Sequence, residues 1–168
     1  HAQFTGRYPG RYQLLQLRAF ATQIGFGIDE TDAVFADMDT HSKLLIVDDN
    51  FLSVGSCNKN NRGIEYEAEL NIAVLDRAWV RAARRRVLAN LLGVTDAGSD
   101  DPATWYGALA RAAAANDAVR ARWVTEGDDL NLNGSPLPAI YRPVGFVYTL
   151  TFGPVADCLL ESIGPDVV

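Results

Sequence analysis

The residues best suited to chemistry lie in two short segments, one around His41 and one around Ser56. Side chains alternate between the two faces of an extended strand, so we expect His41 and Lys43 to project together. Ser56 and Asn58 add neutral hydrogen-bonding groups at the same two-residue spacing. An imidazole can attack phosphorus or shuttle a proton, while an ammonium, a hydroxyl and an amide stabilise non-bridging oxygens. The four residue types together therefore suit a phosphate group.

Each of these residues also has a structural interpretation. A lone histidine on a strand is most often structural or solvent-exposed, and Asp48-Asp49-Asn50 after a strand is most often a turn. The combined spacing favours function: His-x-Lys, four residues, Asp, six residues, Gly-Ser-x-Asn, which specifies six residues over 18 positions. This spacing resembles the signature of the phospholipase D superfamily at every fixed position.

In that superfamily two such motifs meet at a pseudo-twofold axis. One histidine attacks phosphorus and forms a phosphohistidine, and the other protonates the leaving alcohol and then activates water or an acceptor alcohol. The resemblance implies that His41 is the general acid and base, with the nucleophile on the other motif. It further implies that Lys43 and Asn58 hold phosphate oxygens and that Ser56 supports the floor of the pocket.

Two acidic residues acquire roles from the same resemblance. Asp48 is interpreted as a structural carboxylate that ties down the motif rather than as a direct catalyst. Glu69 is similar to the acidic residue that follows the signature and would orient the histidine of the partner motif through its ring nitrogen. Cys57, inside the second segment, is predicted to be a buried packing residue.

The rest of the chain resembles the C-terminal half of eukaryotic-type phospholipases D, over about residues 30 to 164. The matching segments are 77–93, 101–105, 115–117, 145–152 and 159–164. The tail departs from the family at Thr149-Leu150, where relatives have Phe-Pro. The resemblance implies that this chain is the second half of a larger enzyme, cleaved or split.

The histidine count bears on the partner. The chain has two histidines, and His1 has no lysine or aspartate at motif spacing. Since the superfamily mechanism needs two imidazoles, we expect a second polypeptide carrying the N-terminal motif. A homodimer that brings two copies of His41 together is the less favoured alternative.

The hydrophobic pattern predicts an α/β fold, with residues 1–168 as one catalytic domain and a mixed sheet flanked by helices. Predicted helices are 11–24, ending at Gly25, 77–92, capped by Asp76 and ended by Gly93, then 102–115 and 117–125. Predicted extended segments are 33–37, 43–47 (buried), 51–55 in a hairpin with it, 69–75 and 146–152. Residues 127–168 are predicted to form an irregular C-terminal tail because prolines and glycines interrupt it. On helix 77–92 the arginines are predicted to face solvent. The partner polypeptide is expected to dock on the apolar face near Leu70, Ile72 and Val74.

Composition limits the function classes. The net charge of −6 with an isoelectric point near 4.8 argues against a protein that grips nucleic acid by electrostatics. No apolar run has the roughly 18 residues of a membrane span, and no signal-peptide pattern is present. The sequence starts at His1 rather than methionine, so we expect processing or an upstream continuation. The alanine- and arginine-rich composition favours a GC-rich bacterial source, and a processed chain favours export. Cys57 and Cys158 are too few for a disulfide scaffold.

The leading hypothesis is a phospholipase D that hydrolyses phospholipids, or exchanges their headgroup, at a membrane surface. A homodimeric nuclease of the same superfamily is the first alternative, and a binding subunit without activity is the second. No metal-ligand spacing is present, so no cofactor is required, with an accessory calcium ion left open.

Overall fold

The computed structural model describes residues 6–24, 31–38, 40–58, 64–65, 68–126, 130, 132 and 135–150. The chain divides into two compact units, residues 1–39 with 86–150 and residues 40–85 with 151–168. The boundary falls inside the helix α2 (Arg77–Leu92). The α/β class is confirmed, but the described strands form two three-stranded antiparallel sheets rather than one mixed sheet.

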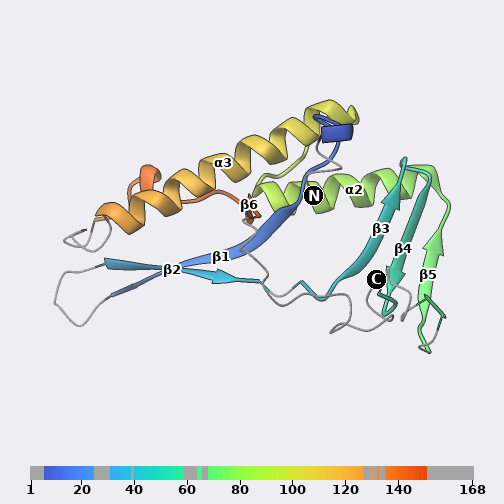
Figure 1. Cartoon of the computed structure of the whole chain (residues 1–168), viewed down its shortest axis with the longest axis horizontal. Coiled ribbons are helices and arrows are strands. Elements are labelled where there is room, and N and C mark those ends of the chain that lie inside the picture. The colour runs from blue at the N-terminus through green and yellow to red at the C-terminus, as the bar shows by residue number, and fades with distance from the viewer. Residues whose placement is uncertain are drawn as a thin grey trace. The chain divides into compact units, whose positions relative to one another are not determined.

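The sheet of the first unit has the order β2-β1-β6 and is covered by the long helix α3 (Figure 1). Its strands are β1 (Leu15–Ile24), β2 (Thr31–Asp37) and β6 (Val147–Thr149). The buried cluster consists of Leu88, Leu109 and Val147. Apolar side chains from β1 and α3 pack around this cluster, so the unit has its own core.

The helix predicted over residues 11–24 is wrong, because Leu15–Ile24 is a strand. The helix was predicted from Leu14, Leu17, Ala21 and Ile24, but Leu15 and Leu17 also fit the two-residue period of a strand, so the pattern alone is ambiguous. Pairing decides the outcome: β1 bonds to β2 from Arg18 onward and to β6 over Leu15–Leu17. The predicted stop at Gly25 lies outside the described residues.

The helix α3 (Pro102–Glu126) is continuous, so the predicted break after Ala115 is also wrong. Asn116, at the expected break, is buried inside the unit. Its side-chain amide donates to the carbonyls of Val144 and Val147 at 2.9 and 3.0 Å and accepts from the Val144 N–H at 2.9 Å. These bonds join α3 to Val144 and to Val147, the first residue of β6. They satisfy the side chain of a buried asparagine within the helix.

The helix α2 begins and ends as predicted. Asp76 accepts a hydrogen bond from the N–H of Trp79 at 3.0 Å, and Gly93 ends the helix with a φ of 67°. A Cβ on Gly93 would lie 2.5 Å from the backbone nitrogen of Gly145, so glycine is needed for this close approach.

The C-terminal region is largely irregular, as predicted, up to Leu150. It contains the short 3-10 helix η3 (Ala139–Tyr141), and the Tyr141 carbonyl accepts from the indole of Trp123 at 2.7 Å. The extended piece predicted over 146–152 is confirmed as β6, although its last two residues and the segment 159–164 lie outside the described residues.

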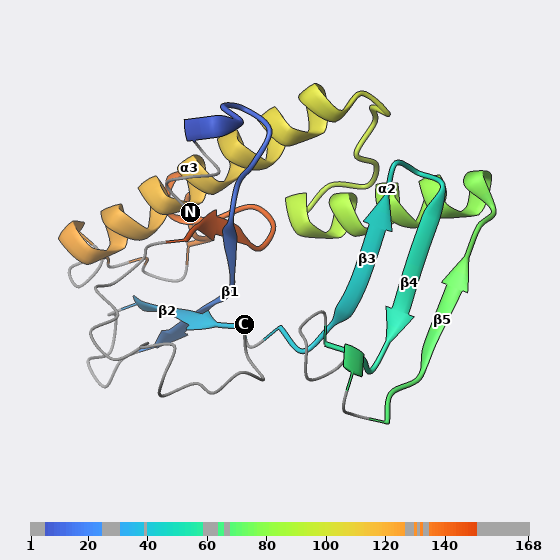
Figure 2. The ribbon, with the colours of Figure 1, turned by 45° about the vertical axis from the view of Figure 1, so that its right-hand side comes forward.

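The sheet of the second unit has the order β3-β4-β5, with the three strands side by side in Figure 2. The strands are β3 (Lys43–Val47), β4 (Phe51–Gly55) and β5 (Asn71–Val74). The predicted hairpin is confirmed, and β5 is shorter than the predicted 69–75. The prediction that 43–47 is buried is wrong for this chain, because Leu44, Leu45 and Val47 are exposed.

Candidate active site

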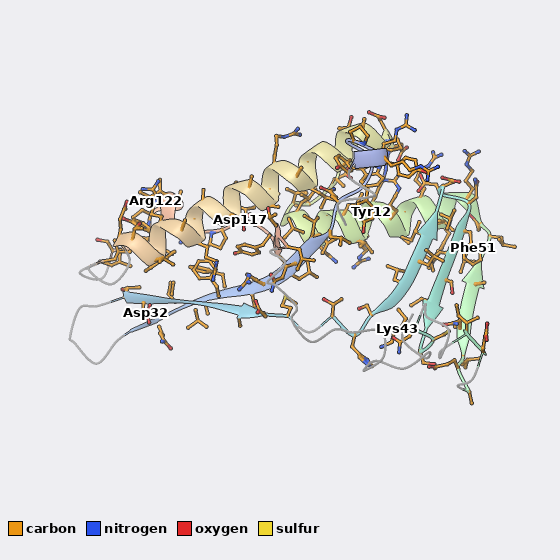
Figure 3. The ribbon with its side chains drawn as sticks, viewed as in Figure 1. Tyr12, Asp32, Lys43, Phe51, Asp117 and Arg122 are labelled. Atoms are coloured by element: carbon orange, nitrogen blue, oxygen red, sulfur yellow. The ribbon has the colours of Figure 1, made fainter. Side chains whose placement is uncertain are left out.

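The predicted site residues gather at one end of the β3-β4-β5 sheet. In an antiparallel sheet, the start of β3, the end of β4 and the start of β5 meet at one end. The register places Lys43 opposite Gly55, and Gly55 opposite Asn71. Figure 3 shows Lys43 at this end and Phe51 at the other end of the hairpin. We call the first the site end and the second the turn end.

His41 and Lys43 lie where the chain enters β3. His41 is exposed, and Lys43 is half-buried. The Lys43 ammonium donates a hydrogen bond to the backbone carbonyl of His41 at 3.0 Å, which keeps the positive charge beside the histidine backbone. This arrangement leaves the imidazole accessible to a ligand or to another motif.

Ser56 and Glu69 form a hydrogen-bonded pair, with the Ser56 hydroxyl donating to the Glu69 carboxylate. The same hydroxyl accepts from the N–H of Leu70 at 3.1 Å, and the Ser56 N–H donates to the Leu70 carbonyl at 3.1 Å. The serine of the motif thus fixes the chain entering β5 and the carboxylate on it. That Glu69 orients a partner's histidine stays a prediction.

Gly55 is required by the approach of β5. A Cβ at this position would lie 2.1 Å from the carbonyl oxygen of Leu70 and 2.2 Å from the side-chain oxygen of Asn71. No Cβ can lie at such distances, so the close approach of β5 requires glycine at this position of the motif. Asn71 was not among the predicted site residues, and its side-chain oxygen accepts a hydrogen bond from the N–H of Cys57 at 3.4 Å.

The last residues of the second motif segment divide into a buried and an exposed one. Cys57 is buried, as predicted, and its Sγ donates to the backbone carbonyl of Asn58 at 3.2 Å. Asn58 itself is exposed, as a residue that binds phosphate would need to be. Cys158 lies outside the described residues.

The carboxylate next to Asp48 in the sequence, Asp49, forms an ion pair with α2, and the role predicted for Asp48 stays a prediction. Asp49 accepts from Nε and Nη2 of Arg84 at 2.5 and 2.8 Å, and Arg81 Nε lies 3.6 Å from the same carboxylate. Asp48 is exposed. Both aspartates have positive φ in the turn, a conformation that aspartate tolerates. The sequence marks both as turn residues and does not show which one faces α2.

Arg84 also corrects the prediction of a solvated arginine cluster. This residue is buried and holds the turn between β3 and β4 onto α2, which makes it a structural residue of the site's own unit. Arg81 and Arg85 are half-buried, while Arg77 and Arg86 are exposed. A run of three arginines in the sequence therefore contains one buried partner of a carboxylate.

Within the described part of the chain, no group of three or more His, Cys, Asp or Glu side chains is placed to hold a metal ion. Among the described residues, no helix combines the length and the hydropathy that crossing a membrane demands. The residues of the candidate site are the His41 and Lys43 pair, the Ser56–Glu69 pair and Asn58.

Residues 7–89 match a protein-family model described as "Cardiolipin synthase, PLD-like domain". The match covers just under half of the chain and includes every predicted site residue, and it supports the phospholipase D superfamily. The match begins at residue 7 and ends within α2, so it includes most of the first 30 residues, to which the predicted resemblance did not extend. No curated protein and no solved structure matches the chain. The narrower resemblance to the C-terminal half of eukaryotic enzymes stays a prediction.

Proposed function

We propose that this chain contributes one motif of a phospholipase D-type site that cleaves the phosphodiester of a phospholipid. The observation that carries the proposal is the gathering of the His-x-Lys and Gly-Ser-x-Asn segments at one end of one sheet. The PLD-like domain supports phosphodiesterase activity, and the phospholipid substrate is our further step.

The reaction we propose has two displacements. A histidine of a second motif attacks phosphorus, and the bond between phosphorus and the headgroup oxygen breaks while His41 donates its proton to the leaving alcohol. His41, now neutral, then takes a proton from water as the oxygen attacks phosphorus and the phosphorus–nitrogen bond breaks. The products are a free alcohol and phosphatidic acid. An acceptor alcohol in place of water gives headgroup exchange.

The positive and polar groups would stabilise the negative charge that develops on the non-bridging oxygens of the phosphate. Lys43 and Asn58 would bind non-bridging oxygens, and their effect grows as the phosphorus becomes five-coordinate. Ser56 would act through Glu69, since its hydroxyl bonds to that carboxylate. Glu69 would in turn orient the imidazole of the second motif. These steps need no resident metal ion.

The second motif would come from another polypeptide, and a homodimer is the less favoured arrangement. Exposed apolar side chains beside the site support a partner: Leu70 and Ile72 are 77% and 64% exposed, and Val54 and Leu44 lie in register with Ile72 across the sheet. Such a surface costs free energy in water and favours a large apolar interface. The N-terminal half of the same enzyme is the partner we propose.

Phospholipid is favoured over nucleic acid by the acidic balance of the chain and by the cardiolipin synthase in the description of the matched family. A homodimeric nuclease stays the second candidate because superfamily membership by itself does not choose the diester. The two differ in oligomeric state as well as in substrate.

The test is headgroup release by the native particle from phosphatidylcholine, compared with nicking of plasmid DNA. We expect choline release, phosphatidyl transfer to added ethanol, and no DNA cleavage. Native mass measurement on the same sample should show a second polypeptide beside the 168-residue chain. DNA cleavage without choline release, or turnover by a monomeric preparation of this chain alone, would overturn the proposal.

A further inference from the structure

One transverse row of the β3-β4-β5 sheet has a glycine between two polar residues. Lys43 pairs with Gly55, and Gly55 pairs with Asn71. Residues that lie directly opposite each other in an antiparallel sheet project from the same face, so the side chains of Lys43 and Asn71 share one face. Their strands are about 10 Å apart, which is twice the spacing of neighbouring strands. No side chain of β4 separates the two residues in this row.

The side chain of Asn71 lies over the glycine of this row. A Cβ on Gly55 would overlap the side-chain oxygen of Asn71, so the amide occupies the space that a larger residue would fill. The same oxygen accepts a hydrogen bond from the N–H of Cys57 at 3.4 Å. The amide of Asn71 therefore extends from β5 across the end of β4.

The bond to Cys57 determines which end of the Asn71 amide remains a donor. A backbone N–H only donates, so the Oδ1 atom faces Cys57 and the Nδ2 atom is turned away from it. Asn71 is exposed, and within the described part of the chain its Nδ2 atom forms no hydrogen bond. The two hydrogens on Nδ2 are therefore available to an external acceptor.

The ammonium of Lys43 lies at the same end of the sheet as this amide. It donates to the carbonyl of His41, which precedes β3, whereas the partner of Asn71 is Cys57, which follows β4. The start of β3 and the end of β4 meet at the site end, where Figure 3 shows Lys43. A positive charge and a neutral donor thus lie on one face at the site end.

We propose that Asn71 is a further substrate-binding residue of this site and that its Nδ2 atom donates to a phosphate oxygen beside Lys43. A neutral N–H that donates to an anion forms a charge-assisted hydrogen bond, which is stronger than a bond between two neutral groups. The nearby carboxylate of Glu69 accepts from Ser56, and Lys43 supplies the positive charge. The inference rests on the proposed function, in that the site binds a phosphodiester.

A purely structural role of Asn71 predicts a different result from a binding role. If Asn71 only held the N–H of Cys57, an aspartate would serve as well, because a carboxylate oxygen also accepts from an N–H. If Nδ2 binds phosphate, an aspartate removes the donor and places a negative charge against the anion. Asn71→Asp therefore separates the two roles, whereas Asn71→Ala removes the acceptor and the donor together.

The binding experiment titrates inorganic phosphate into the full chain at pH 7, with NMR signals of the backbone and side-chain amides as the readout. We expect the Nδ2 signals of Asn71 and the backbone signal of Lys43 to shift with one dissociation constant. Asn71→Ala should weaken phosphate binding about tenfold, and Asn71→Asp about 30-fold or more. In both variants the Lys43 signal reports the binding.

Asn50→Asp is the matched control for charge. Asn50 is exposed in the turn between β3 and β4, so this variant makes the same change of charge at the turn end of the sheet. Its phosphate affinity should change by about twofold or less, because solvent ions screen exposed charges. In Asn71→Asp the N–H of Cys57 should exchange with solvent as slowly as in the wild type, which shows that its acceptor is retained. Circular dichroism confirms that each variant is folded.

Phosphate binding by Asn71→Asp that equals that of the wild type overturns the inference and leaves Asn71 a structural residue. Absence of phosphate binding by the wild-type chain overturns it as well. Cleavage of dibutyroyl phosphatidylcholine by the native particle tests the proposed function separately, and there Asn71→Asp should lower kcat/KM about 30-fold or more. If choline is released while Asn71→Asp binds phosphate normally, the inference fails and the proposed function stands. If phosphate binding depends on Asn71 and no choline is released, the proposed function fails and the phosphate contact stands.

Discussion

The two compact units bury their side chains to different extents. In the first, Val147 and Tyr148 are almost completely buried, and Asn116 and Trp123 direct their polar groups to backbone carbonyls. In the second, Val80 and Leu52 are buried, but much of the sheet's apolar surface is exposed. Among the described residues both units have exposed large apolar side chains, but in the second unit these side chains lie on all three strands of the sheet that carries the candidate site, which fits the partner proposed for it.

The largest expected effect concerns chemistry in the second unit. His41→Ala in the native particle should lower turnover by about 10³-fold or more, since the general acid and base that we propose is lost. Lys43→Ala should lower it by about 10²-fold or more, because the positive charge that we propose to face the phosphate is lost. Choline release measures both. The melting temperature should stay unchanged, and activity within tenfold of wild type for His41→Ala would refute its catalytic role.

The next effect is on the stability of the second unit. Asp49→Ala should cost about 3 kcal/mol, since it leaves the buried Arg84 without its bidentate partner. Asp48→Ala is the matched control in the same turn and should cost less than about 0.5 kcal/mol. Urea unfolding followed by circular dichroism measures both. A larger loss for Asp48 than for Asp49 would reverse our assignment.

A comparable test of the first unit is Asn116→Ala. Three hydrogen bonds to the segment 144–147 disappear, and the buried carbonyl of Val147 loses this donor, so the loss should be about 3 kcal/mol. Asn90→Ala, at an exposed position of α2, should be nearly neutral. Equal unfolding free energies for the two variants would contradict the joining role of Asn116.

A smaller effect is expected at Glu69. Glu69→Gln keeps an oxygen that accepts from Ser56 but removes the negative charge, so we expect an activity loss of about 10- to 100-fold with little change in stability. Initial rates of headgroup release and thermal melts provide the comparison. An unchanged rate would show that the carboxylate acts only on the fold.

The smallest effect is at Tyr148, whose hydroxyl is buried without a hydrogen-bond partner among the described residues. Burial raises the pKa of this phenol above its usual value of 10.0, with Arg18 opposing the shift. Above pH 10 the unfolded chain loses this proton first, so stability falls as the pH rises. At pH 7, Tyr148→Phe should leave the free energy of unfolding unchanged or raise it slightly. Above pH 10, the variant should lose less stability than the wild type. Urea unfolding at pH 7 and above pH 10 measures both effects.

The sequence predicted the local elements whose signals are short and chemical. The hairpin around Asp48, the Asp76 cap and the Gly93 stop are confirmed because turn and cap residues act over a few positions. The strand at Leu15 was mistaken for a helix because only its partners, distant in sequence, decide between the two periods. The choice of Asp49 over Asp48 depends on Arg84, 35 residues away.

For the site, the motif spacing predicted which residues lie near one another at the sheet end, since strand alternation and register follow from the hairpin. It could not predict that Ser56 bonds to Glu69 or that Asn71 supports Cys57, because the approach of β5 is a tertiary contact.

Because Gly55 has no side chain, a substitution at this position would change how closely β5 can approach β4. A single methyl group there would act as a wedge between β4 and β5, since it would overlap the Leu70 carbonyl and Asn71. Gly55→Ala would thus displace Leu70 and the neighbouring carboxylate of Glu69 without removing any side chain that we propose to bind the phosphate. Any homologous chain with a larger residue at this position must place β5 differently or lack it. The residue type at this one position therefore indicates whether the site end of the sheet is assembled in the same way.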